Sequence, residues 1–257
     1  MPIVGAVSGV KTAQEMRTAA VVGSSKPIVP FSSDFTSAVT TPTLSKNLPA
    51  KANLELDEIK RTQYYQSRSI LFHQGEQPSG VFILKCGAVK LSITSSKGRV
   101  IILRIAQSGE ILALSSVLSG EPCIATAETL QDCEVAYVER EQFLQILLHN
   151  PEAALCIAFH MTLNYKMACR QVSLLGLCRS ASERLAQFLL NWSSPKAYCD
   201  GLSVWLGLTH EEISQVAGTT RETVTRTLGH FRKKGWASLA ASKLVIQNRE
   251  AIEKLVA

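Results

Sequence analysis

Short hydrophobic runs separated by glycines fill the middle of the chain. The runs SILFHQGE, KLSIT and RVIILRI are rich in β-branched residues, and glycines recur among them at intervals of about 5 to 12 residues. This spacing is typical of the short strands of an all-β barrel or roll. We therefore predict a β-roll over residues 49–149, with a hairpin turn at SSKG in which Gly98 adopts a positive φ.

A helical period follows the strand-like region. Asn150 can serve as an N-cap, and Pro151 suits the first turn of a helix, where its missing amide donor costs nothing. Apolar residues then recur about every three to four positions, at Leu155, Phe159, Leu163, Met167 and Leu174. We predict one helix over residues 150–179. Its apolar face favours a C2 dimer with the same helix of a second subunit, although packing within one subunit stays open.

Residues 180–257 contain two short helical patterns joined by a glycine. Thr209 and Glu212 have the spacing of a capping box at the start of the first helix. Its inner face carries Ile213, Val216 and Ala217. Gly218 supplies the turn, and Thr220 can cap the second helix. We also expect a Ser180 cap on an earlier helix, and a hairpin turn at Cys199–Gly201.

The second helix has two distinct faces. Its apolar residues face inward, at Val224, Leu228 and Phe231. Its outward face near the N-terminus carries Arg221, Glu222, Thr225 and Arg226. Such a pair of helices is typical of a helix-turn-helix, whose second helix enters the DNA major groove. Because arginine can bond guanine O6 and N7 together and a carboxylate can accept from cytosine N4, we predict that these four residues read bases.

Further polar residues of this region suit contacts with phosphate, which set register without reading sequence. We expect such contacts, or nonspecific attraction to DNA, from Thr219, Thr220, His210, Arg232, Lys233 and Lys234. The composition agrees, with 27 Lys and Arg against 21 Asp and Glu in 257 residues and a formal charge of +6. Charge this mild permits a polyanionic partner without distinguishing nucleic acid from a membrane surface.

The remaining composition bears on location and redox state. Residues 1–48 are rich in Ala, Ser, Thr, Val and Pro without a helical period, and we expect them to be disordered. The start lacks the pattern of a signal peptide, and no run of about 18 apolar residues occurs, so we expect a cytoplasmic protein without a membrane segment. Seven scattered cysteines without a CxxC pair predict free thiols, with a redox switch as the alternative.

The chain from about Leu54 to Val256 resembles the Crp/Fnr superfamily of bacterial transcription regulators. The resemblance lies in FHQGE with the later glycines, in the helix from Asn150, and in RETVTRTL. It implies an α+β fold: an N-terminal double-stranded β-helix (a cyclic-nucleotide-binding-like β-roll), a long dimerisation helix, and a C-terminal winged helix-turn-helix with its wing at KLVIQN. It further implies a homodimer that binds a palindromic TGTGA-like site in the nucleoid through Arg221, Glu222 and Arg226, with RNA polymerase as a partner.

The resemblance also bears on the effector. Members that bind cyclic AMP hold its ribose with a glutamate and its phosphate with an Arg-Ser pair. Here Glu110 follows Gly109, but Cys123 and Ile124 occupy the positions of that pair. A buried phosphate without such donors is costly, so the sequence disfavours cyclic AMP. We expect an unidentified effector, a thiol-based signal or small metabolite, in a pocket of the β-roll that includes Gly109, Glu110, Cys123, Ile124 and Cys169.

Two other prosthetic groups occur in the superfamily. The iron–sulfur cluster is held by cysteines near the N-terminus, and because no cysteine here precedes Cys86 we expect no cluster. Haem members use axial His or Cys, and this chain offers His73, Cys86, His149 and His160. Cys156 lies one helical turn before His160, but two residues do not make a metal site. Haem therefore stays open, and we assign no metal site.

Two other classes of function have less support. A cyclic-nucleotide-binding module that acts through protein contacts would need a catalytic or membrane segment, and we identify neither. An enzyme would need a nucleophile–base pair, a metal cluster or a phosphate loop, so we predict no enzyme. The sequence favours an effector-modulated regulator with a hinge at Ser180.

Overall fold

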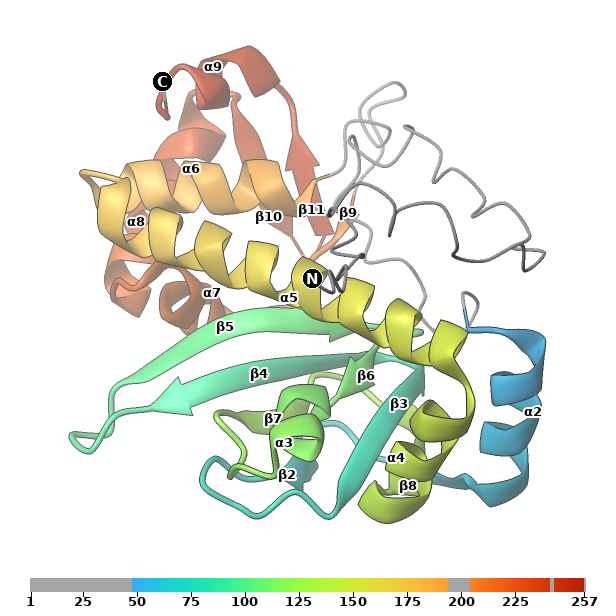
Figure 1. The fold of residues 1–257 in the computed structure, drawn as a ribbon. Coiled ribbons are helices and arrows are strands. Elements are labelled where there is room, and N and C mark those ends of the chain that lie inside the picture. Colours follow the sequence, from blue (N-terminus) through green and yellow to red (C-terminus); the bar gives the residue numbers. More distant parts are fainter. Residues whose placement is uncertain (1–47, 194–203, 241–242, 257) are drawn as a thin grey trace, which may run out of the picture. The chain divides into compact units, whose positions relative to one another are not determined.

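The computed structural model describes residues 48–193, 204–240 and 243–256 (Figure 1). The disorder predicted for residues 1–48 therefore concerns, apart from Leu48, residues outside the described chain. The turn predicted at Cys199–Gly201 also lies outside it. No helix among the described residues has the length and apolar character needed to cross a bilayer.

Two antiparallel sheets of four strands form the β-roll. The first sheet contains, in spatial order, β1 (Arg61–Tyr65), β8 (Cys133–Glu139), β3 (Gly80–Cys86) and β6 (Ile111–Leu112). The second contains β2 (Ile70–Phe72), β7 (Thr126–Thr129), β4 (Ala88–Thr94) and β5 (Val100–Gln107). The predicted hairpin at SSKG joins β4 to β5, and Gly98 has a φ of 78°, so this turn is confirmed.

Helices flank the roll and lead out of it (Figure 1). They are α2 (Ala50–Ile59), α3 (Leu114–Ser119), α4 (Arg140–His149) and α5 (Pro151–Leu177). Pro151 lies in the first turn of α5, as predicted. Asn150 occupies the N-cap position, but its side chain does not cap the helix. Its amide instead donates to Ile146 O (2.9 Å) and to Glu55 Oε2 (2.8 Å), so this side chain joins α2 to α4.

The apolar series predicted along α5 does not form one stripe. Leu155 is 71% exposed, whereas Leu174 is 4% exposed and packs inside its own chain. The reason is geometric, because each step of four residues turns about 40° beyond one full rotation of an α-helix. The buried face of α5 is instead formed by Ala153, Ile157, His160 and Leu174.

The C-terminal region is a winged helix-turn-helix, and the predicted α+β architecture is confirmed. It contains α6 (Ala181–Trp192), α7 (His210–Ala217), α8 (Arg221–Lys233) and α9 (Arg249–Glu253). Ser180 caps α6 through a capping box with Glu183, as expected. A three-stranded sheet contains, in order, β10 (Ala237–Ala240), β11 (Lys243–Ile246) and β9 (Val204–Trp205). The hairpin of β10 and β11 places the wing at KLVIQN.

Candidate nucleic-acid interface and effector cavity

Local hydrogen bonds define the two helices of the helix-turn-helix. Thr209 Oγ1 accepts from Glu212 N (3.2 Å), and Glu212 Oε2 accepts from Thr209 N (2.9 Å), which confirms the capping box. Gly218 ends α7 with a φ of 58°. A Cβ at this position would lie 2.7 Å from Leu175 Cδ2, so both the turn and its packing against α5 favour glycine. Thr220 Oγ1 then accepts from Thr223 N and caps α8.

The inner face of α8 is buried as predicted. Val224, Leu228 and Phe231 are at most 6% exposed, and they share one core with Ile213 and Val216 of α7. The Phe231 ring lies 5.8 Å from that of Trp236, just before the wing. This core fixes the rotation of α8 about its axis, and with it the direction of its outer side chains.

The outer face of α8 presents the four predicted base-reading residues to solvent. Arg221, Glu222, Thr225 and Arg226 are all exposed. Hydrogen bonds from the Glu222 amide and the Thr220 side chain, with the nearby Arg221 charge, lower the pKa of the Glu222 carboxyl below its ordinary value. The carboxylate is therefore ionised near pH 7 and can act only as an acceptor.

His210 lies beside the face that is predicted to read bases. Its Nδ1 is 2.8 Å from Thr225 Oγ1, and this hydroxyl donates to Arg221 O (3.0 Å). The sequence assigned His210 and Thr225 to separate roles, and only the structure brings them together. His210 therefore joins the start of α7 to the exposed face of α8.

The predicted phosphate contacts fall at two ends of α8. Thr219 and Thr220 precede its first turn, beside the predicted base-reading residues. Arg232, Lys233 and Lys234 are exposed at its C-terminal end, about 16 Å further along the axis. The helix thus carries the residues predicted to read bases at one end and positive charge at the other.

A buried ion pair that sequence reasoning missed joins the roll to α7. Lys90 Nζ on β4 lies 3.1 Å from Glu212 Oε1 and 3.0 Å from Glu128 Oε1. Burial opposes ionisation of Glu212, but hydrogen bonds from Thr209 and the Lys90 ammonium outweigh it and lower the pKa of this carboxyl. No sequence signal pairs these residues, because they are 122 positions apart. Glu212 therefore caps α7 and also holds it to the β-roll.

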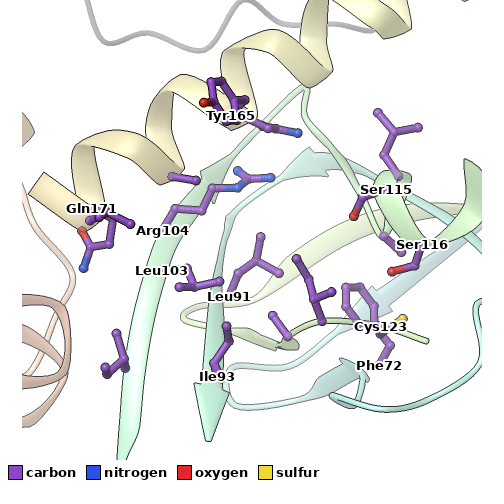
Figure 2. Close-up of a pocket in the computed structure, with 18 of the residues that line it drawn as sticks. Phe72, Leu91, Ile93, Leu103, Arg104, Ser115, Ser116, Cys123, Tyr165 and Gln171 are labelled. Atoms are coloured by element: carbon purple, nitrogen blue, oxygen red, sulfur yellow. The ribbon is translucent and has the colours of Figure 1, made fainter. Parts of the chain in front are cut away.

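A cavity of about 550 Å³ lies in the β-roll beside α5 (Figure 2). Its walls come from the roll, from α3 and from one face of α5. The lining residues are Phe72, Leu91, Ile93, Ser95, Arg99, Ile101, Leu103, Arg104, Ile111, Ala113, Leu114, Ser115, Ser116, Cys123, Ile124, Ala125, Met161, Asn164, Tyr165, Ala168, Gln171, Val172 and Leu175. Of the residues expected at an effector pocket, Cys123 and Ile124 line it, whereas Gly109, Glu110 and Cys169 do not.

The position of Glu110 explains why it is absent from the lining. Its carboxylate is fully buried, pairs with Arg104 Nη1, and accepts from Gln107 N at 2.8 Å. At the positions where the resemblance implies a phosphate-holding pair, Cys123 is buried and Ile124 is 64% exposed. Burial raises the pKa of the Cys123 thiol, which is therefore neutral near pH 7. Neither residue supplies a cation.

The proposed haem and metal ligands do not gather in the described part of the chain. His73, Cys86 and His149 are exposed. No group of three or more His, Cys, Asp or Glu residues suited to a metal occurs among the described residues, and the six described cysteines are free thiols. His160 is buried, and neither of its ring nitrogens has a hydrogen-bond partner among the described residues. Burial lowers its pKa, so its imidazole is neutral near pH 7.

Gln171 connects the cavity to the helix-turn-helix. It lines the cavity from α5, and its Nε2 donates to Ile102 O on β5 (3.2 Å) and to Val216 O on α7 (2.9 Å). Both protons of this amide are therefore used in holding three elements together. Sequence reasoning missed this residue, because a glutamine on a long helix carries no recognisable signal.

Comparison with known proteins supports the two-part reading of the chain. Residues 62–150 match the cyclic nucleotide-binding domain, and residues 183–255 match the Crp-like helix-turn-helix domain. The cAMP-activated global transcriptional regulator CRP of Escherichia coli O157:H7 is 27% identical over 184 residues, which are 71% of this chain and 87% of that protein. The Cyclic AMP receptor protein of Thermus thermophilus is 27% identical over 207 residues, covering 80% and 93% of the two chains.

Solved structures give the same picture. FixK2 from Bradyrhizobium japonicum superposes with a TM-score of 0.68 at 25% identity, covering 77% of this chain and 98% of that chain. The c-di-GMP-responsive global regulator CLP from Xanthomonas campestris shares the fold, with a TM-score of 0.66 at 18% identity over 77% of this chain and 99% of that one. With a cyclic nucleotide-binding domain followed by a Crp-like helix-turn-helix, the chain belongs to the Crp/Fnr family of transcription regulators.

Proposed function

We propose that this protein is a homodimeric regulator that binds a palindromic DNA site and is controlled by an effector in its β-roll. The observation that carries the proposal is the outer face of α8. Arg221, Glu222 and Arg226 are exposed there, while the opposite face of the helix is locked into a core. A rigid helix with its readers at the N-terminal end suits insertion into a major groove.

The reader chemistry supports a particular class of half-site. Two arginines can each bond the paired acceptors of guanine, and the Glu222 carboxylate can accept from a cytosine amine. A half-site with G·C pairs, such as the TGTGA-like sequence that the family implies, supplies both partners. His210 and Thr225 would hold the start of the reading face in register.

The exposed face of α5 supports the homodimer. Large apolar side chains lie on the side opposite to its buried face, where Leu155 is 71% exposed and Leu177 is 77% exposed. An apolar face of this length is unfavourable in water, and a second copy of the same helix would cover it with two-fold symmetry. Such symmetry would match a palindrome. RNA polymerase would be the partner of the DNA-bound dimer.

Two contacts support control by the roll. Gln171 joins the cavity wall to α7, and Lys90 joins β4 to the same helix through Glu212. An effector would change DNA affinity if it bound the states with and without these contacts unequally. Both contacts are made with α7, the first helix of the helix-turn-helix.

Fluorescence anisotropy with labelled duplexes tests the DNA proposal. The full-length chain should bind a TGTGA-like palindrome, with half-sites about one helical turn apart, as two chains per duplex. A scrambled duplex of the same composition should bind about 1,000-fold more weakly at physiological salt. Equal affinity for the two duplexes would contradict the proposal, and so would one chain per duplex.

A further inference from the structure

The cavity in the β-roll has the walls of an apolar binding site. Figure 2 shows Phe72, Leu91 and Leu103 directed toward the same space, and Met161 and Val172 of α5 also line it. Its volume of about 550 Å³ falls within the range of small-molecule sites. Burying an apolar molecule here would be favourable, because it removes apolar surface from water on both sides of the contact.

Among the described residues that line the cavity, no buried cation is free to bind an anionic ligand. The Arg104 guanidinium is already paired with Glu110, whose carboxylate is fully buried. Arg99 also lines the cavity, but it is exposed at the hairpin, where water and salt screen its charge. A phosphate or carboxylate would have to compete with Glu110 for Arg104, and it would disrupt a buried ion pair. The lining therefore favours an uncharged ligand.

Asn164 on the α5 wall has a buried polar atom with no hydrogen-bond partner among the described residues. Asn164 lines the cavity, and its Oδ1 is buried without a hydrogen bond to any described residue. A buried acceptor left unsatisfied costs free energy that a ligand donor would recover. A hydroxyl or N–H group of the ligand that reached this oxygen would satisfy it.

We propose that this cavity binds an uncharged, largely apolar small molecule with one hydrogen-bond donor, and not a cyclic nucleotide. The inference rests on the proposed function only in taking the roll as the sensor. The expected chemistry of the effector follows from the residues that line the cavity. The ligand would lie against Gln171, whose amide also donates to Val216 O of α7. Ligand binding would therefore act directly on a contact with the helix-turn-helix.

A fluorescence titration of the full-length chain tests the ligand class. The probe is N-phenyl-1-naphthylamine, which is uncharged, apolar and has one N–H group. We expect saturable binding of one probe per chain that excess cyclic AMP does not displace. The anionic analogue 8-anilinonaphthalene-1-sulfonate should bind with an affinity at least about tenfold lower. Displacement by cyclic AMP, or tighter binding of the anionic analogue, would overturn the proposal.

Variants then locate the site. Leu103→Trp should fill the cavity and abolish probe binding, whereas Leu118→Trp, on the surface of α3 outside the lining, should leave it unchanged. Asn164→Leu tests the polar contact without adding bulk to the roll. It should weaken N-phenyl-1-naphthylamine by about three- to tenfold but not 1-benzylnaphthalene, which lacks the N–H group.

Equal binding by the two tryptophan variants would contradict the assignment to this cavity, and circular dichroism establishes that each is folded. An equal effect of Asn164→Leu on both probes would contradict the predicted donor contact. The titration contains no DNA. If the probe does not bind, the DNA-binding proposal is unaffected. If the protein does not bind DNA, the proposed class of ligand is unaffected.

Discussion

At the scale of single residues, Gly218 carries the turn of the helix-turn-helix. Its φ of 58° is left-handed, and an added Cβ would meet Leu175 at 2.7 Å. Gly218→Ala should therefore destabilise the protein by about 1–3 kcal/mol in urea unfolding. Gly229→Ala is the matched control, because Gly229 lies within α8 with open space at its Cβ. It should stabilise by about 0.5–1 kcal/mol.

If both alanine substitutions changed the free energy of unfolding in the same direction, the left-handed turn at Gly218 would not be the cause. The two positions are 11 residues apart in one motif, so a shared effect would point to the motif as a whole. If Gly218→Ala lowers the free energy of unfolding and Gly229→Ala raises it, the loss at Gly218 is due to its left-handed backbone conformation.

Lys90 acts between elements, because it joins β4 to α7. Its ammonium is the cation for both Glu128 and Glu212, and all three side chains are at most 22% exposed. Lys90→Met leaves the buried Glu212 carboxylate and the partly buried Glu128 carboxylate without their cation, and it should cost about 3–5 kcal/mol at pH 7 in urea unfolding. Lys51→Met, which removes an exposed partner of Glu55 on α2, should change stability by about 0.5 kcal/mol or less.

The pH dependence of the Lys90→Met deficit has a definite sign. The folded-state pKa of Glu212 is lowered from its ordinary 4.5, so its ionised form stabilises the wild type above that pH. This contribution is lost as the pH falls through the lowered pKa. The deficit of the variant should therefore shrink from pH 7 toward pH 4, as its carboxyls become protonated. A deficit that grows on acidification would contradict the ion pair as its cause.

The exposed face of α5 is the second element-scale feature, and we propose that it mediates the association of two chains. Leu155→Glu places a charge on a side chain that is 71% exposed in the single chain. If two copies of α5 cover this face, the variant should sediment as a monomer and lose tight binding to the palindrome. Leu54→Glu on α2, at 66% exposure, should sediment like the wild type. Identical sedimentation of both variants would remove α5 from the interface.

At the scale of the whole molecule, local chemistry made much of the fold predictable. The capping pairs Ser180–Glu183 and Thr209–Glu212, the turn at Gly218 and the hairpin at Gly98 all depend on residues close in sequence. So does the inward face of α8, because helical periodicity alone sets it. Short-range rules are sufficient for features of this kind.

The contacts that link the two domains were not predictable. Lys90 with Glu212 and Gln171 with Val216 join positions far apart in sequence, and each residue type is common on a surface. The cavity walls likewise come from separate strands and helices. The resemblance suggested Glu110 as a pocket residue, but Arg104 draws its carboxylate into a buried pair. Long-range packing decides such features, and one sequence does not reveal it.

Selection of binding sites from random duplex DNA tests the central claim, that the outer face of α8 reads bases. The wild type should enrich a two-fold symmetric, TGTGA-like site. Arg226→Ala should keep the symmetry, lose preference at one position in each half-site, and weaken specific binding by about 1–3 kcal/mol. Lys233→Ala, at the far end of α8, should keep the wild-type consensus and only reduce affinity and its salt dependence. An unchanged consensus with Arg226→Ala, or no symmetric site with the wild type, would contradict the account.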